Sequence, residues 1–192
     1  MSNRAPLRNP TRKVGVLDLG SNTVLLLVMD ESADVVTDEA RITRLGQGVF
    51  ASGRLHPLAW GRTSAAVEEL SALARRHGVE RLIAVGTEAL RRAGDGTEFL
   101  GDLRTRGLVD EVRLLSGAEE ARYAVEASLR SGPGTGTLTV VDVGGGSTEV
   151  SCAEPARPVL AHSMPLGSVR LTERWVTTDP VSSRELESLR EA

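Results

Sequence analysis

The sequence contains one cysteine, Cys152, among 192 residues. A single thiol excludes a disulfide within the chain and a zinc site built from cysteines, and it fits a reducing compartment. The longest strongly apolar run, Val24–Met29, is far too short to cross a bilayer. Residues 1–12 are basic and contain proline but have no apolar signal core, so we expect a disordered lead-in. From these absences we expect a cytoplasmic protein with no membrane partner.

The sequence also has no excess of basic residues. Lys and Arg number 23 against 26 Asp and Glu, which gives a formal net charge of −3. Without a basic surface, the chain is not expected to bind nucleic acid. Hydrophobic residues make up 40% of the sequence, an ordinary share for a globular protein with a buried core. An anionic ligand would therefore have to be held locally, by backbone amides and a few arginines.

Apolar periodicity and turn residues predict an α/β fold with the opening order βββαβαβα. The expected strands of the first part are 14–19, 23–29, 35–42, 81–87 and 110–116, and its helices are 57–77, 97–106 and 119–130. Residues 131–137 are the clearest linker. Beyond it we expect strands over 138–153, interrupted by a glycine turn, and over 157–163, then helices over 169–175 and 181–190.

Two stretches of the sequence repeat one pattern. "GVLDLGSNTVL" and "VVDVGGGSTEV" share apolar residues, an aspartate, a glycine turn and a second strand, and they place Asp18 and Asp142 at corresponding positions. The repeat predicts two lobes, each led by a βββ unit with covering helices, that face each other across a cleft. The first lobe is expected over 13–130. The second begins over 131–192, and because its pattern is incomplete at Ala192 we expect it to be truncated.

The glycine turn at 144–146 has two interpretations. It lacks the lysine of a Walker A loop and the helix that follows a dinucleotide fingerprint, so it is expected to join two strands. It is then either a tight hairpin, with glycines for backbone freedom alone, or a nest of N–H groups that binds an anion. The matching turn after Asp18 favours the second interpretation, because two such turns can grip one polyanion.

Several charged residues are candidates for chemistry. Asp18, Asp142 and Glu149 can hold Mg²⁺ beside phosphate oxygens, although turn aspartates and a solvent-facing strand glutamate explain them equally simply. In "SGAEEA", Ser116 and Glu119 form a capping box, which leaves Glu120 as a candidate general base or a surface glutamate. The arginines of "GTEALRR" can clamp phosphate or cover an exposed helix face.

Six ordered motifs carry a resemblance to a known family: "VGVLDLGSNTVLLLV", "TRLGQGV", "GTEALR", "SGAEEA", "VVDVGGGSTEV" and "PLGSVRLTE". The sequence resembles the exopolyphosphatase/guanosine pentaphosphate phosphohydrolase family, of the actin-like, ribonuclease H-like superfamily. The resemblance implies hydrolysis of a terminal phosphoanhydride, in polyphosphate or in guanosine pentaphosphate (pppGpp), by direct attack of water with Mg²⁺ or Mn²⁺. It also implies that homodimers form.

The resemblance assigns roles to residues by their motif positions. It implies that Glu120 is the base that activates water, and that Asp142, Glu149 and, more loosely, Asp18 organise the metal ion. The implied phosphate-binding residues are Gly20, Ser21 and Asn22 on the first turn, Gly144, Gly145, Gly146, Ser147 and Thr148 on the second, and Arg91.

Three functions stay open at this point. The first is a metal-dependent phosphohydrolase, which must lose phosphate release when Glu120 becomes Gln. The second is a non-catalytic module that binds polyphosphate or (p)ppGpp, as a truncated second lobe would allow. The third, an ATP-dependent kinase of the same superfamily, is weaker because "SGAEEA" supplies an acid suited to activating water.

Overall fold

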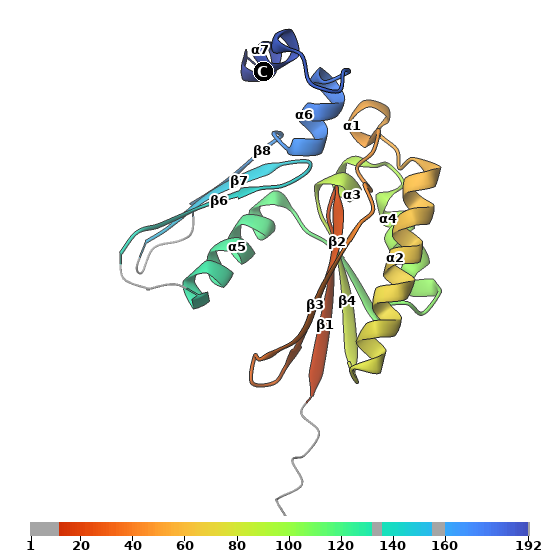
Figure 1. Ribbon diagram of the computed structural model, residues 1–192. Helices are drawn as coiled ribbons and strands as arrows, with labels where there is room; N and C mark the ends of the chain where they lie inside the picture. Colours follow the sequence, from red (N-terminus) through yellow and green to blue (C-terminus); the bar gives the residue numbers. More distant parts are fainter. Residues whose placement is uncertain (1–11, 132–135, 155–159, 192) are drawn as a thin grey trace, which may run out of the picture.

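The computed structural model describes residues 12–131, 136–154 and 160–191 and contains two β-sheets (Figure 1). The first sheet has the strand order β3-β2-β1-β4-β5, and the second has the order β6-β7-β8. The strands are β1 (Lys13–Leu19), β2 (Thr23–Asp30), β3 (Val35–Ile42), β4 (Arg81–Gly86), β5 (Glu111–Leu114), β6 (Leu138–Val143), β7 (Thr148–Ala153) and β8 (Leu160–Met164). The helices are α1 (Val49–Ser52), α2 (Pro57–Arg76), α3 (Glu88–Arg92), α4 (Gly96–Thr105), α5 (Gly117–Ser131), α6 (Ser168–Trp175) and α7 (Ser183–Glu191).

The main hydrophobic core lies between the first sheet and helices α2 and α4, which cover one face of it (Figure 1). Alternation along β1 sends Leu17 and Leu19 into this core, where both are fully buried. The rings of Trp60 and Phe99 meet edge to face, with centroids 4.8 Å apart. The other face of β1 carries Val16 and Asp18, so the aspartate points away from the core and toward the second sheet.

The two glycine turns are closed by the same backbone hydrogen bond. In the first turn, the N–H of Gly20 donates to the carbonyl oxygen of Thr23 at 3.0 Å. In the second, the N–H of Gly144 donates to the carbonyl oxygen of Ser147 at 2.9 Å. Each turn joins two antiparallel strands, β1 to β2 and β6 to β7. The repeat read from the sequence is therefore also a repeat of structure.

Helix α5 links the two sheets. Its first turn is closed by the expected capping box: Glu119 accepts from the N–H and hydroxyl of Ser116 at 2.8 and 2.7 Å, and the Ser116 hydroxyl accepts from Glu119 N–H at 3.3 Å. Ala121 and Val125 are fully buried where α5 packs on β6, β7 and β8. No helix within the described ranges is long and apolar enough to span a bilayer.

The strands and longer helices expected from the sequence are present, with ends shifted by a few residues. The one-turn helices α1 and α3 were not expected. Of the expected linker, Ser131 ends α5 and residues 132–135 lie outside the described residues, as do residues 157–159 of the last expected strand. The expected lead-in also lies outside them, apart from Arg12. The boundaries proposed for two lobes stay predictions.

Candidate active site

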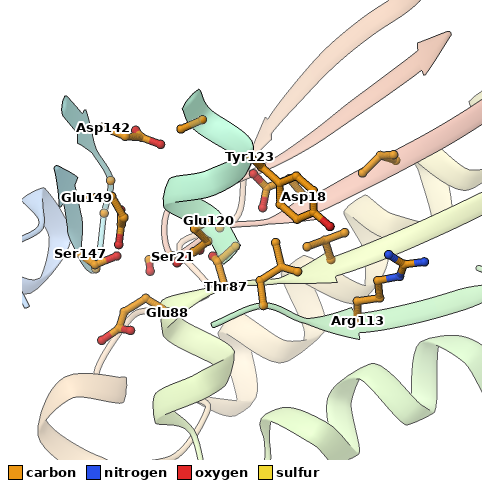
Figure 2. A pocket seen from close by; sticks show the side chains of 18 of the residues that line it. Asp18, Ser21, Thr87, Glu88, Arg113, Glu120, Tyr123, Asp142, Ser147 and Glu149 are labelled. Carbon is orange, nitrogen blue, oxygen red and sulfur yellow. The ribbon is translucent and has the colours of Figure 1, made fainter. Parts of the chain in front are cut away.

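A cavity of about 550 Å³ lies between the outer face of the first sheet, helix α5 and the β6–β7 turn (Figure 2). It brings together most of the site residues expected from the sequence. From the first sheet and its turn come Asp18, Gly20 and Ser21, from α5 comes Glu120, and from β6, β7 and their turn come Asp142, Gly144, Gly145, Gly146, Ser147 and Glu149. Residues more than a hundred positions apart thus line one space.

Asp142 and Glu149 form a pair across the second hairpin. They are directly opposed in the β6–β7 register, so their side chains leave the same face of the sheet. Figure 2 shows both carboxylates, with Ser147, on the side of the cavity formed by this hairpin. Glu149 is 5% exposed, and its Oε1 accepts a hydrogen bond from the Ser163 hydroxyl at 2.7 Å. That bond fixes the Glu149 carboxylate at the cavity wall.

Asp18 carries a buried oxygen with no partner. Its Oδ1 accepts no hydrogen bond from the described part of the chain. Burial is the main reason that the pKa of Asp18 is raised to about 6, and the negative charge of Asp142 acts in the same direction. A buried, unpartnered carboxylate oxygen beside a second carboxylate is costly unless a proton or a cation compensates it. A proton or a hard cation such as Mg²⁺ could supply this compensation.

Glu120 projects into the cavity from the first turn of α5 (Figure 2). Burial is the main reason that its pKa is raised to about 7, and the charges of Glu149 and Asp18 act in the same direction. Arg91 opposes this rise: its Nη1 lies 2.8 Å from Glu120 Oε2. The contact is an ion pair rather than an aligned hydrogen bond, and Nη1 also donates to the Leu115 carbonyl oxygen at 2.6 Å.

Arg91 itself does not line the cavity. Its Nη2 donates to Glu88 Oε2 at 2.8 Å, so its guanidinium is already shared among Glu88, Leu115 and Glu120. Glu88 does line the cavity and was missed by the sequence analysis. Glu88 precedes Arg91 and Arg92 by three and four residues, the spacing at which side chains of one helix form ion pairs. This spacing is the sequence signal that could have identified Glu88.

Asn22 and Thr148 also lie beside the cavity rather than on its wall. The Asn22 carbonyl oxygen accepts from the N–H groups of Thr43 and Arg44, both at 2.9 Å, which fixes the first turn against the loop after β3. The Thr148 hydroxyl donates to the Leu166 carbonyl oxygen at 2.6 Å. Both residues hold a turn in place from behind.

The far end of the cavity is apolar and was also missed by the sequence analysis. Val16, Ile83 and Val85 from the first sheet form its floor, with Tyr123 of α5 and Arg113 of β5 at its edge. Figure 2 shows Arg113 at the opposite end of the cavity from Asp142. The alternation of side chains along β5 indicates only weakly that Arg113 points into the cavity. The direction of the Tyr123 side chain depends on how α5 packs on the sheet, which no local pattern reports.

The model of the Ppx/GppA phosphatase family matches residues 26–192. The chain belongs to the Ppx/GppA phosphatase family. Exopolyphosphatase 2 of Mycobacterium tuberculosis is 35% identical over 190 residues, which cover 93% of this chain and 59% of that protein. The chain thus spans about three-fifths of the length of this Ppx/GppA relative.

Solved structures of Ppx/GppA proteins have the same fold. A family member from Aquifex aeolicus is 34% identical, with a TM-score of 0.72 over 93% of this chain and 59% of its own. An exopolyphosphatase from Cytophaga hutchinsonii, at 23% identity, has a TM-score of 0.81 over 92% of this chain and 58% of its own, and it supports the fold alone. The expected α/β, actin-like fold of the Ppx/GppA family is confirmed.

Proposed function

We propose that this protein hydrolyses a terminal phosphoanhydride bond with water and releases orthophosphate, with inorganic polyphosphate as the first candidate substrate. The observation that carries the proposal is the placement of Glu120, a partly buried carboxylate with a pKa raised to about 7, on the same cavity as the two glycine turns. The exopolyphosphatase relatives support the choice of polyphosphate.

Glu120 would act as the general base. Its carboxylate accepts a proton from the attacking water, and a base whose pKa lies near neutral pH combines a large ionised fraction with a useful affinity for the proton. Arg91 holds this carboxylate from the side opposite the cavity, at 2.8 Å. The base is therefore oriented before substrate arrives, and the rate enhancement depends on that orientation.

The two turns would bind the phosphates of the substrate. Among the described residues, the N–H groups of Gly145 and Gly146 donate to no hydrogen-bond acceptor, so both stay available to an anion. Successive N–H groups without a partner form a nest that neutralises phosphoryl oxygens. The hydroxyls of Ser21 and Ser147 add donors at the same wall.

Mg²⁺ or Mn²⁺ fits the acidic side of the cavity. Asp18, Asp142 and Glu149 would hold it, and the unpartnered Oδ1 of Asp18 is the observation that supports this assignment. No three acidic, histidine or cysteine side chains among the described residues converge into a complete metal centre. Water and substrate phosphates would therefore have to complete the coordination of the ion, as they usually do for Mg²⁺. The bound ion would neutralise charge on the transferred phosphoryl group.

Phosphate release from polyphosphate tests the proposal. We expect Glu120→Gln to lower the rate by at least about 10²-fold, the range of general base catalysis. Glu119→Gln is the matched control. It removes one negative charge from the residue next to Glu120, and the glutamine oxygen can still accept the hydrogen bonds of the capping box. Equal rates for the Glu120→Gln variant and the wild type would contradict the proposal. Tight binding of polyphosphate without release by the wild type would instead favour a binding module.

A second candidate substrate is pppGpp, which presents the same terminal phosphoanhydride on a nucleoside. The observation that favours it is the apolar end of the cavity, which Val16, Ile83 and Tyr123 line. An aromatic ring and an apolar floor suit a purine base, whereas polyphosphate has no apolar part. Tyr123→Ala should then lower kcat/KM for pppGpp about tenfold and leave that for polyphosphate unchanged. Equal losses for both substrates would exclude a nucleoside site there.

The remaining expectations stay predictions: a homodimer, a cytoplasmic location, and the weaker alternative of an ATP-dependent kinase. Transfer of phosphate from ATP to an acceptor, in place of release into water, would revive the kinase alternative.

A further inference from the structure

Helix α6 reaches from the second sheet to the first part of the chain, where it lies beside α1 (Figure 1). Two of its side chains make the contact. Both carboxylate oxygens of Glu173 accept from the N–H of Gly48 at 3.1 Å. The Arg170 guanidinium lies over the Phe50 ring, 5.0 Å from its centroid, and its Nη1 is 3.5 Å from Glu88 Oε1. Of these two anchors, Arg170 is the one that touches a residue of the cavity.

The Glu88 carboxylate forms ion pairs with arginines of two helices, α3 and α6. Its Oε2 pairs with Arg91 Nη2 at 2.8 Å, and its Oε1 pairs with Arg92 Nε at 2.9 Å and with Arg170 at 3.5 Å. Arg92 is half exposed, with 53% of its side chain in solvent, whereas the side chains of Arg91 and Arg170 are 18% and 22% exposed. Ion pairs of partly buried groups are screened less by water, so Arg91 holds Glu88 more firmly than the exposed Arg92 does. Arg170 adds a longer contact that is also shielded from solvent.

The ion pairs continue to the base. Arg91 binds Glu88 through Nη2 and approaches Glu120 Oε2 at 2.8 Å through Nη1. A guanidinium is a rigid plane, so fixing one nitrogen fixes the direction in which the other points. Arg170, Glu88, Arg91 and Glu120 therefore form one chain of ion pairs that runs from α6 through α3 to α5. If α6 only packed on α1, its arginine would need no contact with Glu88, and the ion pairs would not have to lead to Glu120.

We propose that Arg170 is a positioning residue, which acts through Glu88 and Arg91 to hold the carboxylate of Glu120 in its reactive orientation. This inference rests on the proposed role of Glu120 as the general base. It means that one side chain of α6, the helix that follows the second phosphate-binding turn and β8, aligns a base located on α5.

Kinetics on polyphosphate with Arg170→Gln test the inference. We expect kcat to fall about tenfold, the scale of a small misplacement of a catalytic group, while KM changes less than about twofold. Arg170→Lys should restore part of kcat, because a lysine keeps the charge opposite Glu88. Glu173→Gln is the matched control: it weakens the other anchor of α6 but does not touch Glu88, so its kcat should stay within about twofold of the wild type.

A double mutant shows whether Arg170 acts through Glu88. If it does, Arg170→Gln combined with Glu88→Gln should have the kcat of Glu88→Gln alone, because the path is already broken. Losses that multiply would overturn the inference, as would a Glu173→Gln variant as slow as Arg170→Gln. Melting temperatures of all variants identify any that fail to fold, and Arg170→Lys then carries the test.

An NMR measurement is independent of activity. In the wild type and in Glu173→Gln, the Nη hydrogens of Arg91 should give separate, slowly exchanging signals, because three partners stop rotation of the guanidinium. In Arg170→Gln the Glu88 carboxylate loses one of its arginines and holds Arg91 less firmly, so these signals should broaden and exchange faster. If they do not, the inference is wrong even where the proposed function holds. If the wild type releases no phosphate but the signals respond as expected, the proposed function fails and the positioning of Arg91 stands.

Discussion

Ser21 of the first turn lies directly against Gly146 of the second: a Cβ placed on Gly146 would stand 2.6 Å from the Ser21 Oγ. The same Cβ would also meet Phe50 Cζ at 2.8 Å and Glu88 Cγ at 2.9 Å. The two glycine turns thus touch at the cavity wall, and glycine is required at position 146 for close approach rather than for an unusual backbone angle.

The first prediction concerns this contact. Gly146→Ala should separate the turns, lower the rate of phosphate release at least about tenfold and destabilise the fold by about 1–3 kcal/mol, because three neighbours must move at once. Gly61→Ala is the control. Gly61 lies in α2 with open space around it, so alanine there should stabilise the helix by about 0.5–1 kcal/mol and leave the rate unchanged. Thermal melting and a phosphate assay measure both effects. A Gly146→Ala variant with the wild-type rate would show that the turns need not touch.

Much of this arrangement could be predicted from the sequence because its causes are local. The alternation of apolar residues predicts β1 and β2, and the glycine turn after β1 puts Asp18 at a strand end. Ser116 and Glu119 form a capping box, which predicts the start of α5. The repeated turn then placed Asp142 opposite Asp18. Each inference used residues within a few positions of one another, where sequence spacing fixes geometry.

The parts that could not be predicted depend on distant contacts. Glu88 is 82 positions from Arg170, and no local pattern reports that ion pair. The apolar end of the cavity exists because α5 carries Tyr123 over a sheet face formed by other strands. The one-turn helices α1 and α3 are too short for periodicity to reveal, since a single turn has no stable identity without its tertiary neighbours.

The second prediction is the pH dependence of catalysis. Since Glu120 must be ionised to accept a proton and its pKa is about 7, kcat/KM should fall about tenfold per pH unit below pH 7. Arg91 lowers this pKa, so Arg91→Gln should move the acid limb of the profile to higher pH. Glu119→Gln should leave the limb in place. An Arg91→Gln profile that moves to lower pH, or not at all, would contradict the ion pair as the relevant contact.

The third prediction concerns stability. The pKa of Asp18 is about 6 in the folded protein against 3.8 for an ordinary aspartate, so the folded state binds this proton more tightly. Its contribution to stability is present below about pH 4 and is lost as the pH rises through about 6. At pH 8, without Mg²⁺, Asp18→Asn should therefore raise the free energy of unfolding by about 1–3 kcal/mol.

The gain from Asp18→Asn should shrink at pH 4, where the wild-type carboxyl is largely protonated in the folded state. Asp38→Asn is a suitable control, because Asp38 is exposed on β3 and should show no such pH-dependent gain. Urea unfolding at the two pH values measures the difference. A gain of equal size at both would mean that the effect comes from packing rather than from the charge.

The last prediction concerns the metal ion. Mg²⁺ bound to the folded state at a hundredfold excess over its Kd should stabilise it by about 2.7 kcal/mol, which thermal melting at pH 8 would detect. Asp142→Asn should lose most of this gain, because the carboxylate that faces Asp18 and Glu149 is removed. Glu187→Gln, an exposed change on α7, should keep the gain. If Asp142→Asn and Glu187→Gln respond to Mg²⁺ alike, the ion acts by general screening, and the acidic wall of the cavity does not bind it.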